Sequence, residues 1–301
     1  MIDLQNPYAY EASLNNILHK TPPREVGVER IVITLLNDIL SYLGKWPKFS
    51  AEETSTSTFS KSLLEDIYGL IVTSVPDGMI LDDSVTYQQA VTSQQAQGGN
   101  KYIRSHVLIE VKHFNTNPDE YVFTGKEAPK VIKKLRKQLK NESAIRNIIK
   151  EILQAANELR KVNSSVSIQN KWKVELLPRE TKTDGACPIK ITDPSRTVAT
   201  LHQLDTYLLE CYLYAGIKGV IWTNGLCWKI WKKNVLGRVC SSSDIMLDGN
   251  QRRYVEYEYR GNDEYPVPID ASGNLLKAID INPVYFAKFK RKLKYFLSTT
   301  L

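Results

Sequence analysis

The segment H-V-L-I-E-V-K-H-F, residues 106–114, constrains the fold more than any other part of the chain. In an extended strand, successive side chains point to opposite faces of the sheet. One face therefore carries Val107, Ile109 and Val111, and the other carries Leu108, Glu110 and Lys112. Because both faces contain apolar residues, we expect this strand to lie buried in the centre of a sheet.

The composition of the whole chain is that of a globular protein. The chain has 301 residues, of which 42% are hydrophobic and 24% charged, so it can bury a substantial core. Strand and helix patterns alternate along it. We therefore expect an α/β fold in which a central mixed sheet is flanked by helices on both faces.

Cysteine usage and the absence of apolar runs bear on location. The four cysteines, Cys187, Cys211, Cys227 and Cys240, form no C-x-x-C pair, which disfavours a structural zinc site. The N-terminal sequence M-I-D-L-Q-N-P-Y lacks a signal pattern, and no uncharged apolar run approaches membrane length. These features predict a cytoplasmic protein with reduced thiols and no membrane association.

Two segments before the central strand have clear patterns. Apolar residues recur with helical spacing from Val28 to Leu43, beside Glu29, and Gly44 is expected to end that helix. Strand residues then surround a bend at Pro76, so that Asp77 would begin a new strand. The Gln- and Gly-rich residues 87–100 are interpreted as a long loop.

Several elements are predicted after the central strand. Residues 128–162 have a helical pattern, Trp172–Leu177 a strand pattern, and Asp184–Arg196 is interpreted as a Pro-containing connection. A helix over 201–215 would place Gln203 and Tyr207 one turn apart. In G-V-I-W-T-N-G-L-C-W-K-I-W, Asn224-Gly225 predicts the turn of a β-hairpin. The basic C-terminal helix has an apolar seam, formed by Phe286, Phe289, Leu293 and Phe296, that could pack on the core or on a second copy.

The central strand also carries the residues that suggest chemistry. A buried carboxylate and ammonium cost several kcal/mol each unless they are paired or bound to a metal, so Glu110 and Lys112 favour a functional site. With Asp77, they provide hard oxygen ligands suited to Mg²⁺ and an ammonium that could act on a water molecule. A second E-x-K, Glu180 to Lys182, lies in a polar, Pro-flanked segment without strand character. An ordinary salt-bridged strand edge is the alternative.

Three motifs, in this order along the chain, resemble the PD-(D/E)xK nuclease superfamily in its RecB-like form, whose additional motif is Q-x-x-x-Y. They are P-D-G-M-I-L, I-E-V-K and Q-L-D-T-Y. The hairpin K-G-V-I-W-T-N-G-L-C-W-K-I-W resembles the one in the N-terminal nuclease domain of type I restriction subunits. The early helix ending in L-S-Y-L-G resembles the first motif of that domain. The resemblance covers roughly residues 24–231 and implies a restriction-endonuclease-like core.

The resemblance also implies roles for individual residues. Asp77 and Glu110, together with the Val111 backbone carbonyl, would bind Mg²⁺ or Mn²⁺, and Lys112 would be the catalytic lysine. Gln203 and Tyr207 would position the lysine, the water or the phosphate. Glu29 would be an auxiliary acid near the metal. Two alternatives stay open: the long spacing before Glu110 leaves Asp82 or Asp83 as the acidic ligand, and Glu25 could replace Glu29 on the same helix face.

These implications predict a Mg²⁺-dependent deoxyribonuclease, with an endonuclease preferred. The net charge of +7 and pI near 9.0 agree with a DNA partner. The residues expected to contact the DNA backbone are Lys126, Lys130, Lys133, Lys134, Arg136 and Lys137. The chain contains no G-x-x-x-x-G-K-[ST] motif, so a separate motor or specificity protein could act with it. The alternative function is an inactive DNA-binding or assembly module on the same fold.

The predicted organisation comprises two regions. Residues 20–235 would form the nuclease domain, with residues 118–165 as a basic helical insertion. Residues 236–301 would form a C-terminal extension that ends in the basic amphipathic helix. Because cleavage of both strands needs two active sites or two visits, a homodimer is plausible.

Overall fold

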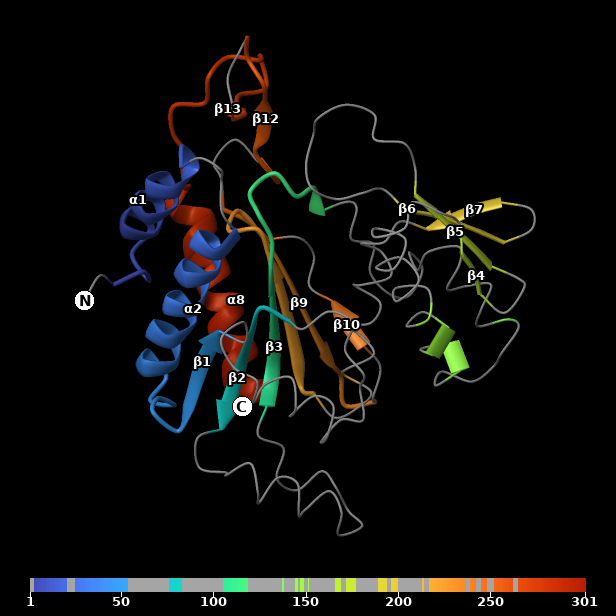
Figure 1. The fold of residues 1–301 in the computed structure, drawn as a ribbon. Helices are drawn as coiled ribbons and strands as arrows, with labels where there is room; N and C mark the ends of the chain where they lie inside the picture. The colour runs from blue at the N-terminus through green and yellow to red at the C-terminus, as the bar shows by residue number, and fades with distance from the viewer. Residues whose placement is uncertain are drawn as a thin grey trace. The chain divides into compact units, whose positions relative to one another are not determined.

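The chain forms two compact units in a computed structural model (Figure 1). One unit comprises Met1–Pro118 and Leu213–Leu301, and the other comprises Asp119–Tyr212. The structure describes residues 3–20, 25–53, 76–82, 105–118, 137, 144–145, 147–148, 151, 166–168, 172–176, 189–193, 196–199, 213, 217–236, 239–241, 245–247, 252–261 and 265–301.

A seven-stranded mixed sheet organises the first unit. Its strands are β1 (Phe49–Glu53), β2 (Gly78–Asp82), β3 (Ser105–Val111), β8 (Gly219–Thr223), β9 (Cys227–Lys233), β10 (Val239–Ser241) and β11 (Ile245–Met246). Their order is β1-β2-β3-β8-β9-β10, and β11 also pairs with β9. The β3–β8 pair is parallel and the other pairs are antiparallel. The predicted α/β class with a mixed central sheet is therefore confirmed.

Strand β3 occupies the centre of this sheet, as its apolar pattern predicts. Leu108 and Ile109 point to opposite faces, and both are fully buried. The face with Ile109 belongs to the main hydrophobic core. Glu110, on the face with Leu108, is buried as well, so the strand places a carboxylate inside the protein.

Three helices pack on one face of the sheet: α1 (Pro7–Leu18), α2 (Glu25–Tyr42) and α8 (Pro283–Thr300) (Figure 1). The predicted helix from Val28 is present in α2, and Gly44 follows it with a φ of 66°. Apolar residues of α2 contribute to the core at helical spacing. These are Val28, Val32, Leu35, Leu36, Ile39 and Leu40. Helices on the other face remain a prediction.

The C-terminal helix α8 is part of this core. Its apolar seam, from Phe286 to Phe296, is buried against the sheet and the other helices. Near its end, the ring of Phe296 passes so close to Gly219 that a Cβ there would lie 2.4 Å from Cζ of the ring. Glycine at this strand position therefore allows the helix to pack tightly on the sheet. The seam packs on the chain's own core.

The turn between β8 and β9 is a buried junction. Gly225 has a φ of 86°, the left-handed conformation that glycine adopts readily. Asn224 Oδ1 accepts hydrogen bonds from the backbone N–H of Leu226 and Cys227, at 3.1 and 2.8 Å. The Gly225 carbonyl accepts a hydrogen bond of 2.8 Å from the hydroxyl of Tyr10 in α1. The predicted hairpin is confirmed, and its turn is inside the protein.

The second unit contains a four-stranded antiparallel sheet. Its strands, in order, are β4 (Val166–Ile168), β5 (Trp172–Leu176), β6 (Ile189–Asp193) and β7 (Arg196–Ala199). Strand β5 confirms the prediction for Trp172–Leu177. The interpretation of Asp184–Arg196 as a connection is wrong for residues 189–193, because β6 pairs with both neighbours. Back in the first unit, β12 (Glu256–Glu258) and β13 (Val267–Ile269) form a separate hairpin.

Candidate active site

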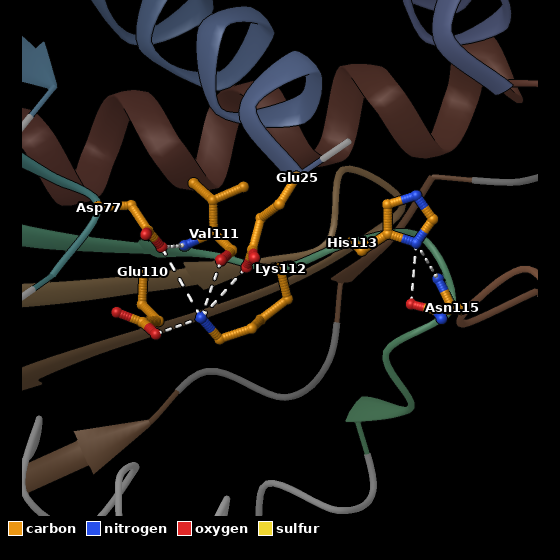
Figure 2. Close-up of polar contacts among 7 residues, drawn as sticks. All are labelled: Glu25, Asp77, Glu110, Val111, Lys112, His113 and Asn115. Atoms are coloured by element: carbon orange, nitrogen blue, oxygen red, sulfur yellow. Dashed lines mark hydrogen bonds and ion pairs between the residues drawn. The ribbon is translucent and has the colours of Figure 1, made fainter. Parts of the chain in front are cut away.

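Three elements of the first unit meet where β3 ends. Antiparallel pairing of β2 with β3 aligns Gly78 with Ile109, so the residue before β2, Asp77, lies beside the end of β3. Helix α2 begins at Glu25, close to the same point (Figure 2). The strand order and the start of one helix thus bring acidic residues from distant parts of the sequence to Lys112.

The side-chain ammonium of Lys112 is surrounded by oxygen atoms (Figure 2). Its Nζ lies 3.2 Å from Glu25 Oε1 and 3.8 Å from Asp77 Oδ2, and it forms an ion pair with Glu110 Oε1. It also donates a hydrogen bond of 3.1 Å to the carbonyl of Val111. We refer to these five residues as the Lys112 cluster. Asp77, Glu110 and Lys112, which the sequence analysis singles out, are therefore brought together in it.

Backbone geometry fixes Asp77 within the cluster. Its Oδ2 accepts a hydrogen bond of 2.6 Å from the backbone N–H of Val111. Burial, followed by the negative charge of Glu110, raises the pKa of Asp77, and Lys112 and the Val111 N–H offset this effect only in part. Asp77 therefore binds a proton more readily than an ordinary aspartate, and a bound cation would offset the negative charge of Glu110 in the same way.

The cluster is only partly open to solvent. The exposed fraction is 8% for the side chain of Glu110, 21% for Lys112, 25% for Asp77 and 43% for Glu25. Solvent can therefore reach the ammonium from the side of Glu25, whereas Glu110 is enclosed. Breaking such a buried pair by removing one partner is costly, because the remaining charge loses its compensation.

Glu25 and Glu29 occupy different environments although they are one helical turn apart. Glu25 contacts Lys112, as described above. Glu29 is only 4% exposed, and its Oε1 has no hydrogen-bond partner among the described residues. Burial, with the charges of Asp77, Glu53 and Glu25, raises the pKa of Glu29 to about 7. Of the two acids that the sequence leaves open, Glu25 is the one that contacts the lysine.

One of the alternative acidic ligands lies at the far end of β2 and is therefore outside the cluster. Asp82 is the last residue of β2 and pairs with Phe49, four residues along the strand from Gly78. At about 3.3 Å per residue, it lies well over 10 Å from the start of the strand. Asp83, the other alternative, lies outside the described residues.

The loop that follows Lys112 is held by the buried turn. The backbone N–H of Lys112 donates a hydrogen bond of 2.8 Å to the Thr223 carbonyl, which extends the pairing of β3 with β8. Asn224 Nδ2 donates to the carbonyls of Thr116 and Arg253, at 3.0 and 2.9 Å. The sequence assigns Asn224 to a turn only, and its second role in supporting the site loop depends on contacts distant in sequence.

Other predicted site residues lie outside the described part of the chain. These are Gln203, Tyr207, Lys126, Lys130, Lys133, Lys134 and Arg136. Lys137 is described as a helical, exposed residue of the second unit. The contribution of all seven undescribed residues to catalysis or DNA binding stays a prediction.

The donor set of the Lys112 cluster suits a hard divalent cation. Its oxygens come from three carboxylates and one backbone carbonyl, the ligand types that Mg²⁺ prefers. In the described residues, however, no three Asp, Glu, His or Cys side chains are already arranged as a metal site. The carboxylates contact the ammonium instead. The chemistry of the donors therefore fits a cation, although their present arrangement is that of an ion-pair network.

Comparison with protein-family models, curated proteins and solved structures found no match to this chain. Among the residues that the structure describes, no helix has the length and apolar character needed to cross a lipid bilayer.

Proposed function

We propose that the chain is a Mg²⁺-dependent deoxyribonuclease, with endonucleolytic cleavage preferred, and that the Lys112 cluster is its active site. The observation that carries the proposal is the convergence of Glu25, Asp77, Glu110 and the Val111 carbonyl on the Lys112 ammonium. These groups come from a helix and two strands, and they combine oxygen ligands with a cationic side chain. Metal-dependent phosphodiester hydrolysis can use both kinds of group, the oxygens to bind the metal and the cation to offset charge on the phosphate.

Asp77, Glu110 and the Val111 carbonyl would hold the metal ion. When bound, such an ion polarises the phosphate and lowers the pKa of a water molecule. As an ammonium, Lys112 Nζ would orient the attacking water and offset charge that develops on the phosphate oxygens, whereas accepting the proton of the water would require its neutral amine form. The Val111 N–H fixes Asp77 in position, and the burial of Glu110 limits the access of competing water.

We further propose that the mixed sheet with α1, α2 and α8 is a restriction-endonuclease-like core. The support is topological: Asp77 immediately precedes β2, Glu110 lies on the adjacent antiparallel strand β3, and the lysine follows two residues after Glu110. Basic residues 126–137 would contact the DNA backbone, and Gln203 and Tyr207 would complete the site. A homodimer and a separate motor or specificity protein are the proposed assembly partners.

A cleavage assay tests this proposal. Purified full-length chain is incubated with linear, circular and single-stranded DNA in Mg²⁺ or Mn²⁺, and then with EDTA. We expect cleavage that EDTA abolishes, and a loss of at least about 10²-fold in rate for Lys112→Ala and for Asp77→Ala. Lys277→Ala, at an exposed position outside the cluster, is the matched control. Cleavage that persists in both cluster variants would place the activity elsewhere.

One observation favours the alternative function, an inactive DNA-binding or assembly module. The three acidic residues of the Lys112 cluster form ion pairs with Lys112, and they are not arranged around a metal position. An ion-pair network of this kind could hold α2, β2 and β3 together without any reaction. DNA binding by wild type with no cleavage under either cation, and unchanged binding by Lys112→Ala, would support the module.

A further inference from the structure

The Lys112 ammonium occupies the position where the oxygens of the cluster converge. Four oxygens contact or approach Nζ, from Glu25, Asp77, Glu110 and Val111 (Figure 2). A divalent cation bound by Asp77, Glu110 and the Val111 carbonyl would need the same oxygens. The ammonium and the cation therefore compete for one position, because two cations within a few ångströms repel each other strongly in a partly buried site.

The charge of the cluster indicates that both cations can be kept if the ammonium moves aside. With all three carboxylates ionised, as a bound cation favours, the carboxylates and the ammonium carry a net charge of −2, which one divalent cation neutralises. Glu25 is suited to receive the displaced ammonium, since it is already 3.2 Å from Nζ and is the most exposed of the three acids. Glu110 and Asp77, which are less exposed, would be released to the cation.

We infer that cation binding displaces the Lys112 ammonium from Asp77 and Glu110 to Glu25, and that Glu25 is a positioning residue that acts through Lys112. This inference rests on the proposed function, because it takes the Lys112 cluster to be the cation site. It adds that, without metal, the lysine ammonium holds the cation position and offsets part of the negative charge of the cluster. Glu25 then keeps the lysine beside the cation, where its Nζ can still reach a water molecule.

The inference is tested by Ca²⁺ binding, measured by isothermal titration calorimetry on the full chain without DNA. Lys112→Met removes the competing charge and is expected to bind Ca²⁺ at least about tenfold more tightly than wild type. Lys277→Met, which removes the same charge from an exposed position, should leave the affinity unchanged. Lys112→Gln provides a second, polar variant if the apolar one does not fold. Equal or weaker binding by the folded Lys112 variants overturns the inference.

A double-mutant cycle tests the role of Glu25. Glu25→Gln should weaken Ca²⁺ binding several-fold when Lys112 is present, because the displaced ammonium loses its partner. In the Lys112→Met background the same substitution should have much less effect. Glu25→Asp, which keeps the charge, should restore part of the affinity. Equal weakening in both backgrounds would mean that Glu25 acts on the cation directly, and would overturn its assignment as a positioning residue.

The two proposals fail in distinguishable ways. DNA cleavage by wild type, together with unchanged Ca²⁺ affinity in the Lys112 variants, would overturn the displacement and leave the nuclease proposal in place. Tighter Ca²⁺ binding by those variants, with no cleavage by wild type in Mg²⁺ or Mn²⁺, would support the displacement and overturn the nuclease. If neither wild type nor the variants bind Ca²⁺ the displacement is overturned, and if wild type also fails to cleave DNA in Mg²⁺ or Mn²⁺ both proposals are wrong.

Discussion

Replacing Gly225 with alanine should destabilise the first unit strongly. Alanine in the left-handed conformation costs about 1–2 kcal/mol, of which the loss of unfolded-state freedom returns about 0.4–1 kcal/mol. A Cβ at this position would also lie 3.1 Å from Val28 Cγ1, 3.2 Å from Phe114 Cε1 and 3.4 Å from Leu14 Cδ2. These side chains are fully buried and come from three different segments, so they have little room to move.

The expected magnitude follows from adding the two effects. Overpacking of a close-packed core typically costs about 1–3 kcal/mol. We therefore expect Gly225→Ala to lower the free energy of unfolding by about 1–5 kcal/mol. Gly273 is the matched control, because it has a φ of 77° but no atom within 4 Å of an added Cβ. Gly273→Ala should cost about 1 kcal/mol or less.

Urea unfolding followed by circular dichroism measures both variants against wild type. The midpoint should fall much further for Gly225→Ala than for Gly273→Ala, with an unchanged dependence on urea concentration. Because the turn also supports the loop after Lys112, through Asn224 and the Thr116 carbonyl, Gly225→Ala should weaken any activity of the cluster as well. If the two variants differ by less than about 0.5 kcal/mol, the core around Gly225 is not tightly packed and the reasoning is refuted.

Three further predictions follow from the site and its support. The pKa of Glu29 is about 7, above the ordinary 4.5, so the folded metal-free protein binds this proton more readily than the unfolded chain. The free energy of unfolding should therefore fall as the pH rises from about 4.5 to about 7. Glu29→Gln should make the fall shallower in urea unfolding from about pH 5 to pH 8, whereas Glu256→Gln, at an exposed position, should leave it unchanged. Mg²⁺ should raise the unfolding temperature of wild type but not of Asp77→Asn, and an equal rise in both would remove Asp77 from the cation site. Tyr10→Phe should cost about 1–3 kcal/mol in urea unfolding, since it leaves the buried Gly225 carbonyl without its hydroxyl donor, and a neutral result would mean that this carbonyl finds another donor.

Local pattern predicts the elements that form the cluster. The alternation around Glu110 predicts a central strand with the carboxylate and Lys112 on one side, and the structure has that strand. Helix α2 and the Asn224-Gly225 hairpin are likewise predictable from apolar spacing and turn chemistry. These features depend on residues within one element, which the sequence presents directly.

Features that depend on contacts between distant elements could not be predicted in the same way. Glu25 and Glu29 share a helix face, so spacing alone does not decide which acid reaches Lys112; the position of α2 relative to β3 does. Strand β6 lies in a segment with turn-forming residues and is stabilised by pairing with β5 and β7. Likewise, only the packed structure shows that the α8 seam lies on the chain's own core.

The position of α8 in the core has a consequence for biosynthesis. Phe286 of α8 is buried against Tyr10 of α1, yet it is translated more than 260 residues after α1. A nascent chain that has emerged only as far as β9 carries every residue of the Lys112 cluster but lacks α8, so the apolar surface on which that helix packs is uncovered. We therefore expect protease resistance and any cleavage activity to appear late in biosynthesis, only once α8 has left the ribosome and packed on the sheet.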